Sequence, residues 1–340
     1  MSTLRPVEVV GGGVGGLALG LALRRSGVPV TLFEAGDYPR HRVCGEFIAG
    51  LSGTTVAALG LKEILADCTP HRAVTYVVRG RALPPFALPA TAWGISRHTL
   101  DHRLARAFVA AGGDLRTGTR VPEDQAPEGR VFAAGRRRKG PFWVGLKVHA
   151  PGLALANDFE VHLGDRAYVG LSRTETGAVN VCGLFAPREA GGQGTDLLLA
   201  YLAAAGLGGL AGRLRAGGLD PGTFCTTAAP LGDPAVPPSD RPRIGDACAS
   251  IPPFTGNGLA MALQGAEEAL APLQSYAAGT STWAEAAGAL AGRQRRRFRR
   301  RLRFAALLHP FILERRRQSL VAFLARGRLI PFGALYSVLH

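Results

Sequence analysis

Cysteines are few in this sequence, and they lie far apart. The five cysteines include no Cys-x-x-Cys pair, and their number is odd. These spacings argue against a disulfide framework and against a structural zinc site. Free cysteines are typical of a reducing compartment. We therefore expect a cytoplasmic protein without a bound metal.

The chain also lacks long hydrophobic runs. No uncharged apolar stretch reaches the roughly 18 residues that a transmembrane helix needs. The first residues do not have the charged and apolar segments of a signal peptide, and no repeat at a solenoid period is present. With 47% hydrophobic residues among 340, the chain can bury a large core in one or two domains.

Acidic residues are scarce beside basic ones. There are 25 of the former and 40 of the latter, for a formal net charge of +15. The basic residues cluster at 136–139, 293–303 and 315–317, which favours anionic partners. No nucleic-acid recognition motif accompanies them, so no nucleic-acid partner is expected. Apolar residues beside the last two clusters leave two interpretations open: peripheral contact with an anionic membrane surface, or a solvated basic face.

The hydrophobic pattern predicts an α/β protein. Residues 6–10, 14–26 and 28–34 read as strand, helix and strand, which form a βαβ unit. Four strand-like runs between 141 and 185 indicate an antiparallel sheet. The other predicted strands are 72–79, 91–96, 114–119, 130–133 and 241–246, and the other predicted helices are 99–111, 195–215, 257–272 and 283–325.

This order of elements does not fit two consecutive domains. We expect a discontinuous Rossmann-like domain with an inserted antiparallel substrate domain and a C-terminal helical region. The predicted boundaries are 1–70, 97–140 and 223–278 for the dinucleotide domain, 71–96 and 141–222 for the substrate domain, and 279–340 for the basic helices.

Three glycines after the first strand carry the clearest functional signal. Gly11, Gly13 and Gly16 form G-x-G-x-x-G between a strand and a helix. The glycines permit a tight turn, close approach of a pyrophosphate, and close helix packing, and the helix N-terminus attracts phosphate. Glu34 ends the second strand, where a carboxylate can accept hydrogen bonds from ribose hydroxyls. The sequence therefore predicts a dinucleotide site.

NAD and FAD share this fingerprint, and a second segment discriminates between them. Residues 243–258, RIGDACASIPPFTGNG, resemble the second flavin motif of the p-hydroxybenzoate hydroxylase-like flavoproteins. That group includes aromatic monooxygenases, flavin halogenases and geranylgeranyl reductases. The resemblance implies that Asp246 binds the ribityl chain of FAD. It also implies that Gly256, Asn257 and Gly258 face the flavin pyrimidine.

Two further segments are similar to the same family. Residues 39–46, PRHRVCGE, resemble its loop after the second strand, which implies that Arg42 lies along the diphosphate. Arg97, at the start of a helix, would contact the cofactor, although a surface arginine is an open alternative. The complete predicted set is Gly11, Gly13, Val14, Gly15, Gly16, Glu34, Ala35, Arg42, Arg97, Val121, Gly245, Asp246, Pro253, Gly256, Asn257 and Gly258.

The resemblance leaves the reaction open. A monooxygenase would use FAD, O2 and NAD(P)H as transient donor on a hydrophobic polyketide-like or isoprenoid-like molecule of secondary metabolism. The halogenase signature Trp-x-Trp-x-Ile-Pro is absent from the sequence. The Cys44-Gly45-Glu46 sequence resembles geranylgeranyl reductases, which saturate C=C bonds of polyprenyl chains, and makes Cys44 a candidate catalytic thiol or a plain buried cysteine. A non-enzymatic flavin-binding protein is a third hypothesis. Nothing in the sequence indicates the oligomeric state.

Two features of the middle strands bear on the substrate. Their apolar and aromatic residues could line a pocket or form plain core; they are Phe142, Trp143, Val144, Leu146, Tyr168, Val169 and Leu171. His149 or His162 could serve as a general base, and a structural histidine is the alternative for each.

Overall fold

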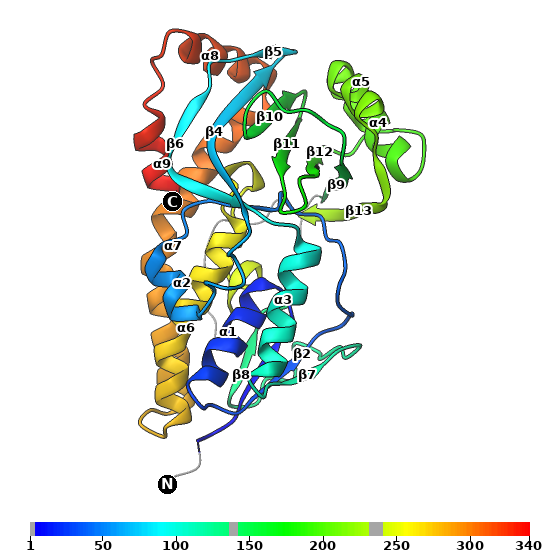
Figure 1. Cartoon of the computed structure of the whole chain (residues 1–340). Coiled ribbons are helices and arrows are strands. Elements are labelled where there is room, and N and C mark those ends of the chain that lie inside the picture. The colour runs from blue at the N-terminus through cyan, green and yellow to red at the C-terminus, as the bar shows by residue number, and fades with distance from the viewer. Residues whose placement is uncertain (1–3, 136–141, 231–240) are drawn as a thin grey trace.

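The computed structural model describes residues 4–135, 142–230 and 241–340. The basic block at 136–139 lies outside the described residues. Figure 1 shows a small sheet with its helices in the lower half of the molecule and a larger sheet in the upper half.

The small sheet is parallel and four-stranded, in the order β7-β2-β1-β8. Its strands are short. The central strands β1 and β2 are mostly apolar and buried, as parallel strands usually are, whereas the edge strand β7 exposes Asp114 and Arg116. This confirms the predicted Rossmann-like sheet. The strands are β1 (Val7–Val10), β2 (Val30–Phe33), β7 (Asp114–Arg116) and β8 (Arg130–Phe132).

Two helices cross closely beside this sheet. Helix α1 (Val14–Arg25) follows β1, and helix α6 (Gly258–Ala277) packs against it. A methyl group at Gly15 would lie 3.1 Å from the carbonyl oxygen of Ala262, so small residues permit the crossing. The crossing brings the segment before α6 next to the glycine loop, although more than 200 residues separate them. Helix α3 (Arg97–Ala110) also packs on α1, and α2 (Gly53–Leu59) lies near α6.

The large sheet has nine strands, in the order β13-β9-β12-β11-β10-β4-β6-β3, with β5 paired to β4. The sequence predicted an antiparallel sheet, and all pairs are antiparallel except β4 with β10. Those two strands belong to separate chain segments joined through the small-sheet domain, and such a long connection permits parallel pairing. The strands are β3 (Phe47–Ile48), β4 (Thr69–Val78), β5 (Arg81–Ala82), β6 (Phe86–Gly94), β9 (Phe142–Ala150), β10 (Phe159–Gly164), β11 (Ala167–Arg173), β12 (Val179–Phe185) and β13 (Asp220–Pro230).

The two faces of the large sheet differ in polarity. Side chains alternate between faces along a strand, so Leu146 and Val148 of β9 point one way and Lys147 and His149 the other. The apolar face packs on α4 (Gly194–Ala204) and α5 (Gly208–Gly217). Of the two interpretations left open for residues 146, 169 and 171, plain core is therefore the one that the structure supports, because all three belong to this core.

Three predicted boundaries differ from the structure. The helix expected at 195–215 is broken by Gly206, which has φ +76°. Residues 241–246 form only a single parallel bridge, Phe132 to Arg243, because Pro242 has no N–H to donate. Strand β13 pairs with β9 through residue 230, so the domain boundary expected at 223 falls inside a strand of the large sheet.

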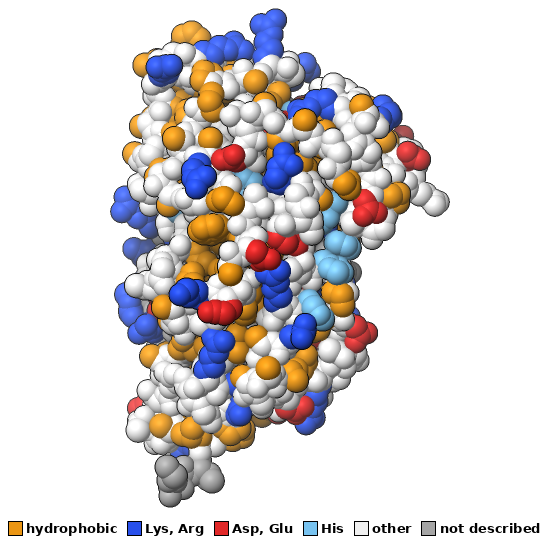
Figure 2. All heavy atoms as spheres, in the orientation of Figure 1, with side chains coloured by type: hydrophobic (Ala, Val, Ile, Leu, Met, Phe, Trp, Pro, Cys, Tyr) orange, Lys and Arg blue, Asp and Glu red, His pale blue; other side chains and the backbone are white. Residues whose placement is uncertain are grey.

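The C-terminal region, predicted to form basic helices, contains three helices in residues 283–339. They are α7 (Trp283–Leu313), α8 (Arg315–Arg326) and α9 (Phe332–Leu339), and the extended backbone of Glu314 separates the first two. Part of the basic cluster on α7 is paired, since Arg293 and Arg297 reach Glu267 and Glu268 of α6. Among the described residues no helix is long and apolar enough to span a bilayer. Figure 2 shows basic side chains along the edge formed by α7.

His309 of α7 provides a pH-dependent test of the packing between α7 and the large sheet. Its ring stacks on Phe254, with centroids 5.5 Å apart, and burial lowers the pKa of His309 to about 4. Between about pH 6.5 and pH 4 the unfolded chain binds a proton here that the folded chain does not. His309 therefore does not lower the free energy of unfolding above about pH 6.5, and it lowers that free energy progressively as the pH drops towards 4. In urea unfolding across this range, His309→Phe should show a shallower decline; an unchanged decline would contradict the assignment.

Candidate functional site

The glycine loop between β1 and α1 combines two tight positions with one open position. Gly11 has φ +111°, and a methyl group there would lie 2.5 Å from the carbonyl carbon of Ala133. A methyl group at Gly16 would lie 2.0 Å from the carbonyl oxygen of Gly11. At Gly13 the nearest atom to an added methyl group is Arg97 Nη2, at 4.0 Å. Gly11 and Gly16 therefore hold the loop's shape, and Gly13 presents bare backbone to open space.

Glu34 follows β2 and is hydrogen-bonded to the same loop. Its Oε2 accepts a hydrogen bond from Gly12 N at 2.7 Å, and its Oε1 accepts one from Gly36 N at 3.0 Å. Arg40 also pairs with this carboxylate. The hydroxyl of Tyr38 donates to the carbonyl of Gly12 at 2.5 Å. Burial and the charge of Glu34 raise the pKa of Tyr38, so this hydroxyl keeps its proton and remains a donor.

Two arginines converge beside the loop on the buried carboxylate of Asp101. Arg97 donates two hydrogen bonds to it, both 2.8 Å long. Arg42 Nε lies 3.2 Å from Asp101 and Arg42 Nη2 lies 3.6 Å from Glu34. Both of these Arg42 nitrogens are buried and make no hydrogen bond. Burial and the neighbouring Arg97 lower the pKa of Arg42. Guanidinium groups beside the open backbone of a helix N-terminus can bind an anionic group.

The second predicted flavin segment, residues 243–258, lies close to the glycine loop because α6, which follows it, crosses α1. Gly245 has φ +59° and begins a 3-10 turn, η1 (Gly245–Ala247), that contains Asp246 and contacts α6. A second turn, η2 (Pro253–Thr255), precedes Gly256 at φ +67°. Asn257, just before α6, is fully buried; its Nδ2 donates to the carbonyl of Leu339, and its Oδ1 has no hydrogen-bond partner.

Val121 and Ala35 lie near the end of β2. The loop after β7 is tied to this end by a hydrogen bond from Thr119 N to the carbonyl of Glu34, 2.9 Å long. Ala35 itself is exposed. Both residues are therefore at the carboxyl edge of the small sheet, on the side of Glu34.

Cys44 lies between the arginines and the large sheet. Its sulfur accepts a hydrogen bond from Glu46 N at 3.4 Å, and its carbonyl accepts one from Asn180 Nδ2 at 3.0 Å. Burial is the largest cause of a raised pKa at the Cys44 thiol. The group is therefore a neutral thiol at neutral pH, which can donate a proton but is a poor nucleophile.

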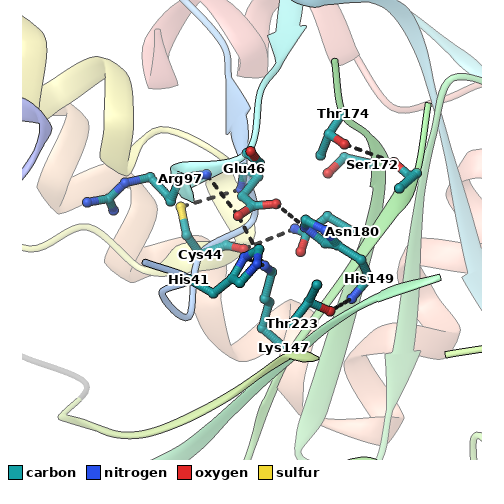
Figure 3. Close-up of polar contacts among 12 residues, drawn as sticks. His41, Cys44, Glu46, Arg97, Lys147, His149, Ser172, Thr174, Asn180 and Thr223 are labelled. Carbon is teal, nitrogen blue, oxygen red and sulfur yellow. Dashed lines mark hydrogen bonds and ion pairs between the residues drawn. The ribbon is translucent and has the colours of Figure 1, made fainter. Parts of the chain in front are cut away.

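A buried polar cluster on the large sheet was not predicted. Glu46 is fully buried, and its Oε1 accepts from Arg97 N at 2.9 Å and lies 3.3 Å from Lys147 Nζ. Its Oε2 lies 2.7 Å from His149 Nε2. His41 completes the cluster, with Nδ1 at 3.1 Å from Lys147 Nζ. Figure 3 shows these side chains meeting between the loop that carries Cys44 and strand β9.

The protonation of this cluster is partly fixed by its geometry. Burial and the charge of Lys147 lower the pKa of His41 to about 4. A neutral His41 accepts the Lys147 hydrogen bond at Nδ1, so its own proton is on Nε2. His41 also stacks on His98, with centroids 4.7 Å apart. The potential metal-ligand atoms of His41, Glu46 and His149 lie within 4.8 Å of one another. Because Lys147 contacts two of these groups, the cluster already contains its own cation.

The sequence carried only a weak signal for this cluster. Lys147 and His149 are ionisable residues two apart on a strand, which places them on one face of the sheet. Their partners Glu46 and His41 are more than 100 residues away in sequence. The positive φ of Glu46, +52°, is visible only in the structure.

Comparisons with known proteins agree with this architecture. Residues 9–43 match the family model of an NAD(P)-binding Rossmann-like domain. Two curated relatives are each 28% identical to part of this chain. One is a 1H-pyrrole-2-carbonyl-[peptidyl-carrier protein] brominase of Pseudoalteromonas luteoviolacea, over 38% of this chain. The other is a menaquinone reductase of Mycolicibacterium smegmatis, over 39% of this chain. The matches cover 32% and 34% of those relatives, about a third of their length.

Solved structures match over nearly the whole chain. HpxO of Klebsiella pneumoniae, in a variant form complexed with FAD, has a TM-score of 0.74 at 20% identity and covers 98% of each chain. PqsL of Pseudomonas aeruginosa, described as a probable FAD-dependent monooxygenase, has a TM-score of 0.66 at 16% identity, covering 94% of this chain and 99% of its own. The protein thus has the mixed α/β fold of FAD-dependent monooxygenases. Within that fold, residues 9–43 are the part that matches the NAD(P)-binding Rossmann-like model.

Proposed function

We propose that this protein is an FAD-dependent oxidoreductase of the monooxygenase type, acting on a hydrophobic small molecule with NAD(P)H and O2. The observation that supports it most is the open backbone of Gly13 at the start of α1, where the nearest atom to an added methyl group is Arg97 Nη2 at 4.0 Å. A diphosphate matches both features, since its oxygens accept from guanidinium groups and from a helix N-terminus.

The other residues of the site fit the same cofactor. Glu34 would bind the ribose hydroxyls, with Ala35 and Val121 beside it, and Asp246 would bind the ribityl chain. Asn257 and the first turn of α6 would face the flavin ring, whose reduced form is anionic and is stabilised by a helix N-terminus. A bound FAD would supply the redox chemistry, with NAD(P)H as the electron donor and O2 as the source of the oxygen atom that enters the substrate and of the one released as water.

The domain division is also a proposal. The dinucleotide domain would comprise the small sheet with α1, α3 and α6. The large sheet would cover the flavin ring with its polar face, because Ser172 and Asn180 on that face donate to the carbonyls of Gly45 and Cys44. The chain's own residues then bind and orient the substrate and exclude water.

The experiment that tests the function begins with the absorbance spectrum of the purified protein and chromatography of the released cofactor. FAD at one per chain is expected, reducible by NADH or NADPH without air. On mixing the reduced protein with O2, a transient absorbance before the oxidised spectrum is expected of a monooxygenase. A protein that binds neither FAD nor FMN, even after reconstitution, would refute the proposal.

A second candidate is an ene-reductase that saturates C=C bonds of a polyprenyl chain, and the neutral thiol of Cys44 favours it. Proton transfer by a positioned group contributes about 10²–10⁴-fold to a rate. If Cys44 donates that proton, Cys44→Ala should lower turnover of a polyprenyl substrate by at least about 100-fold while FAD remains bound. Cys68→Ala is the matched control, since this buried thiol also has a raised pKa and lies away from the large sheet's polar face. Equal turnover of the two variants would exclude the role.

We also propose peripheral contact with an anionic membrane surface. On α8, Leu320 and Phe323 are exposed at 49% and 70%, and Leu329 just after it is exposed at 64%. Arg316 lies on the same face of α8 at helical spacing, and hydrophobic residues beside arginine suit a lipid interface. Phe323→Glu should abolish cosedimentation with phosphatidylserine vesicles, whereas Val109→Glu, at an exposed position on α3, should not. Equal binding to phosphatidylcholine vesicles would contradict the proposal.

A further inference from the structure

The buried pair of Glu46 and His149 has the geometry of an acid–base dyad. Glu46 is fully buried, the His149 side chain is 8% exposed, and Glu46 Oε2 lies 2.7 Å from His149 Nε2. An ionised carboxylate can only accept, so Nε2 carries the proton. The other ring nitrogen, Nδ1, is then a lone-pair acceptor. No hydrogen bond engages it among the residues that the structure describes.

The carboxylate of the dyad is also paired with a buried cation. Lys147 Nζ lies 3.3 Å from Glu46 and balances its charge. Titratable groups near the dyad, among the residues that the structure describes, include His41, His98, Arg97, Cys44, Cys182 and Cys225. Burial keeps the three thiols neutral by raising the pKa of each, and His41 is neutral. The contact between Glu46 and His149 is nevertheless the one found in catalytic carboxylate–histidine pairs, in which the carboxylate orients the ring.

The backbone holds the dyad rigidly. Glu46 has φ +52°, a conformation that is uncommon outside glycine and that concentrates at functional sites. Its side chain is fixed from α3 by Arg97 N and from β9 by His149. The backbone N–H of His149 donates to Thr223 Oγ1 at 2.8 Å. Loop, helix and sheet thus meet at this carboxylate.

We propose that His149 Nδ1 is the general base that removes the proton from a phenol or enol hydroxyl of the substrate. Glu46 and Lys147 are positioning residues. In this step the O–H bond breaks and its proton moves to Nδ1. The electron pair stays on the substrate oxygen, and the imidazolium is paired with Glu46. The resulting anion is the electron-rich form that accepts oxygen in a hydroxylation. The inference rests on the proposed function and narrows its substrate to hydroxyl-bearing aromatic or enolic compounds.

A second carboxylate–histidine pair provides a matched control. His162 Nε2 lies 2.9 Å from Glu160 on the opposite face of the sheet. There Arg213 also binds the carboxylate, 2.8 Å away. The local contact is similar, but this face packs on α5. Glu160→Gln should therefore alter His162 without altering His149.

The first test is nitrogen-15 NMR of the histidine side chains in the full chain, with His149→Gln and His162→Gln used for assignment. In the wild type, neutral His149 is expected to carry its proton on Nε2. Glu46→Gln should weaken the preference of neutral His149 for the form protonated on Nε2 and leave His162 unchanged. A neutral His149 protonated on Nδ1, or a tautomer insensitive to Glu46→Gln, would overturn the dyad. These signals do not depend on flavin, so a protein without flavin would refute the proposed function separately.

The second test uses 4-nitrophenol, whose absorbance reports its own ionisation. At a pH below its solution pKa, the wild type and Glu160→Gln should bind it as phenolate. His149→Gln should lower the bound phenolate fraction at least about tenfold. An equal bound phenolate fraction in the wild type and in His149→Gln would refute the role of His149 as the general base. Absence of binding to the wild type at millimolar 4-nitrophenol would overturn the substrate class.

Discussion

Alanine at Gly13 is expected to weaken FAD binding at least about tenfold, or 1.4 kcal/mol, with almost no effect on the fold. An added methyl group would meet nothing closer than Arg97 Nη2 at 4.0 Å, and the φ of −78° suits any residue. The methyl group would instead occupy the surface that we propose the diphosphate approaches. Gly13 also caps α1, and losing a glycine there should cost less than about 1 kcal/mol.

The measurement is fluorescence titration of the flavin-free protein with FAD, together with thermal unfolding of the same sample. Gly212→Ala is the control, because this helical glycine of α5 also has open space around it and lies away from the site. If Gly13→Ala binds FAD with wild-type affinity, the diphosphate does not lie against Gly13. Loss of the fold itself would contradict the open geometry at Gly13.

Methionine at Lys147 should destabilise the protein by about 3–5 kcal/mol, the usual effect of removing one partner of a buried ion pair. Lys147 and Glu46 are both fully buried. Without the ammonium, the carboxylate keeps only the Arg97 N–H and His149 as partners. The double variant Glu46→Gln, Lys147→Met should recover much of the loss, because no uncompensated charge then remains. Urea unfolding of the single and double variants gives the coupling free energy.

Two further readouts test the cause of that loss. Removing the cation should raise the pKa of His41 from about 4, because Lys147 is one of the groups that lower it. Arg213→Met should cost less than Lys147→Met, since Arg213 is 39% exposed and His162 still pairs with Glu160. Equal losses of unfolding free energy in the two variants, together with an unchanged pKa of His41, would indicate a general packing effect.

Local sequence could predict the small sheet and its glycine loop, because the signals lie within one segment. Gly11, Gly16 and Glu34 have spacings that a βαβ unit requires, and the structure brings them together. The large sheet was harder. Its parallel β4–β10 pair joins segments separated by a whole domain, and no local pattern encodes such a pairing.

The buried cluster could not be predicted for a different reason. The contact between Glu46 and His149 spans 103 residues. It depends on the register of β9, since shifting the strand by one residue would exchange Lys147 and His149 for Leu146 and Val148. The alternation in β9 was visible in the sequence, but which face meets the loop at Cys44 depends on α4 and α5 covering the other face.

The crossing of α1 and α6 has a consequence for synthesis of the chain. Strand β1 pairs with β8 (residues 130–132), and α1 packs on α6 (residues 258–277). Both β1 and α1 therefore remain partly uncovered until those later residues have been synthesised. Until then the nascent chain exposes the apolar surface of α1, which is the kind of surface that chaperones bind. The cofactor site is therefore among the last parts of the molecule to form, and contacts of such long range slow folding.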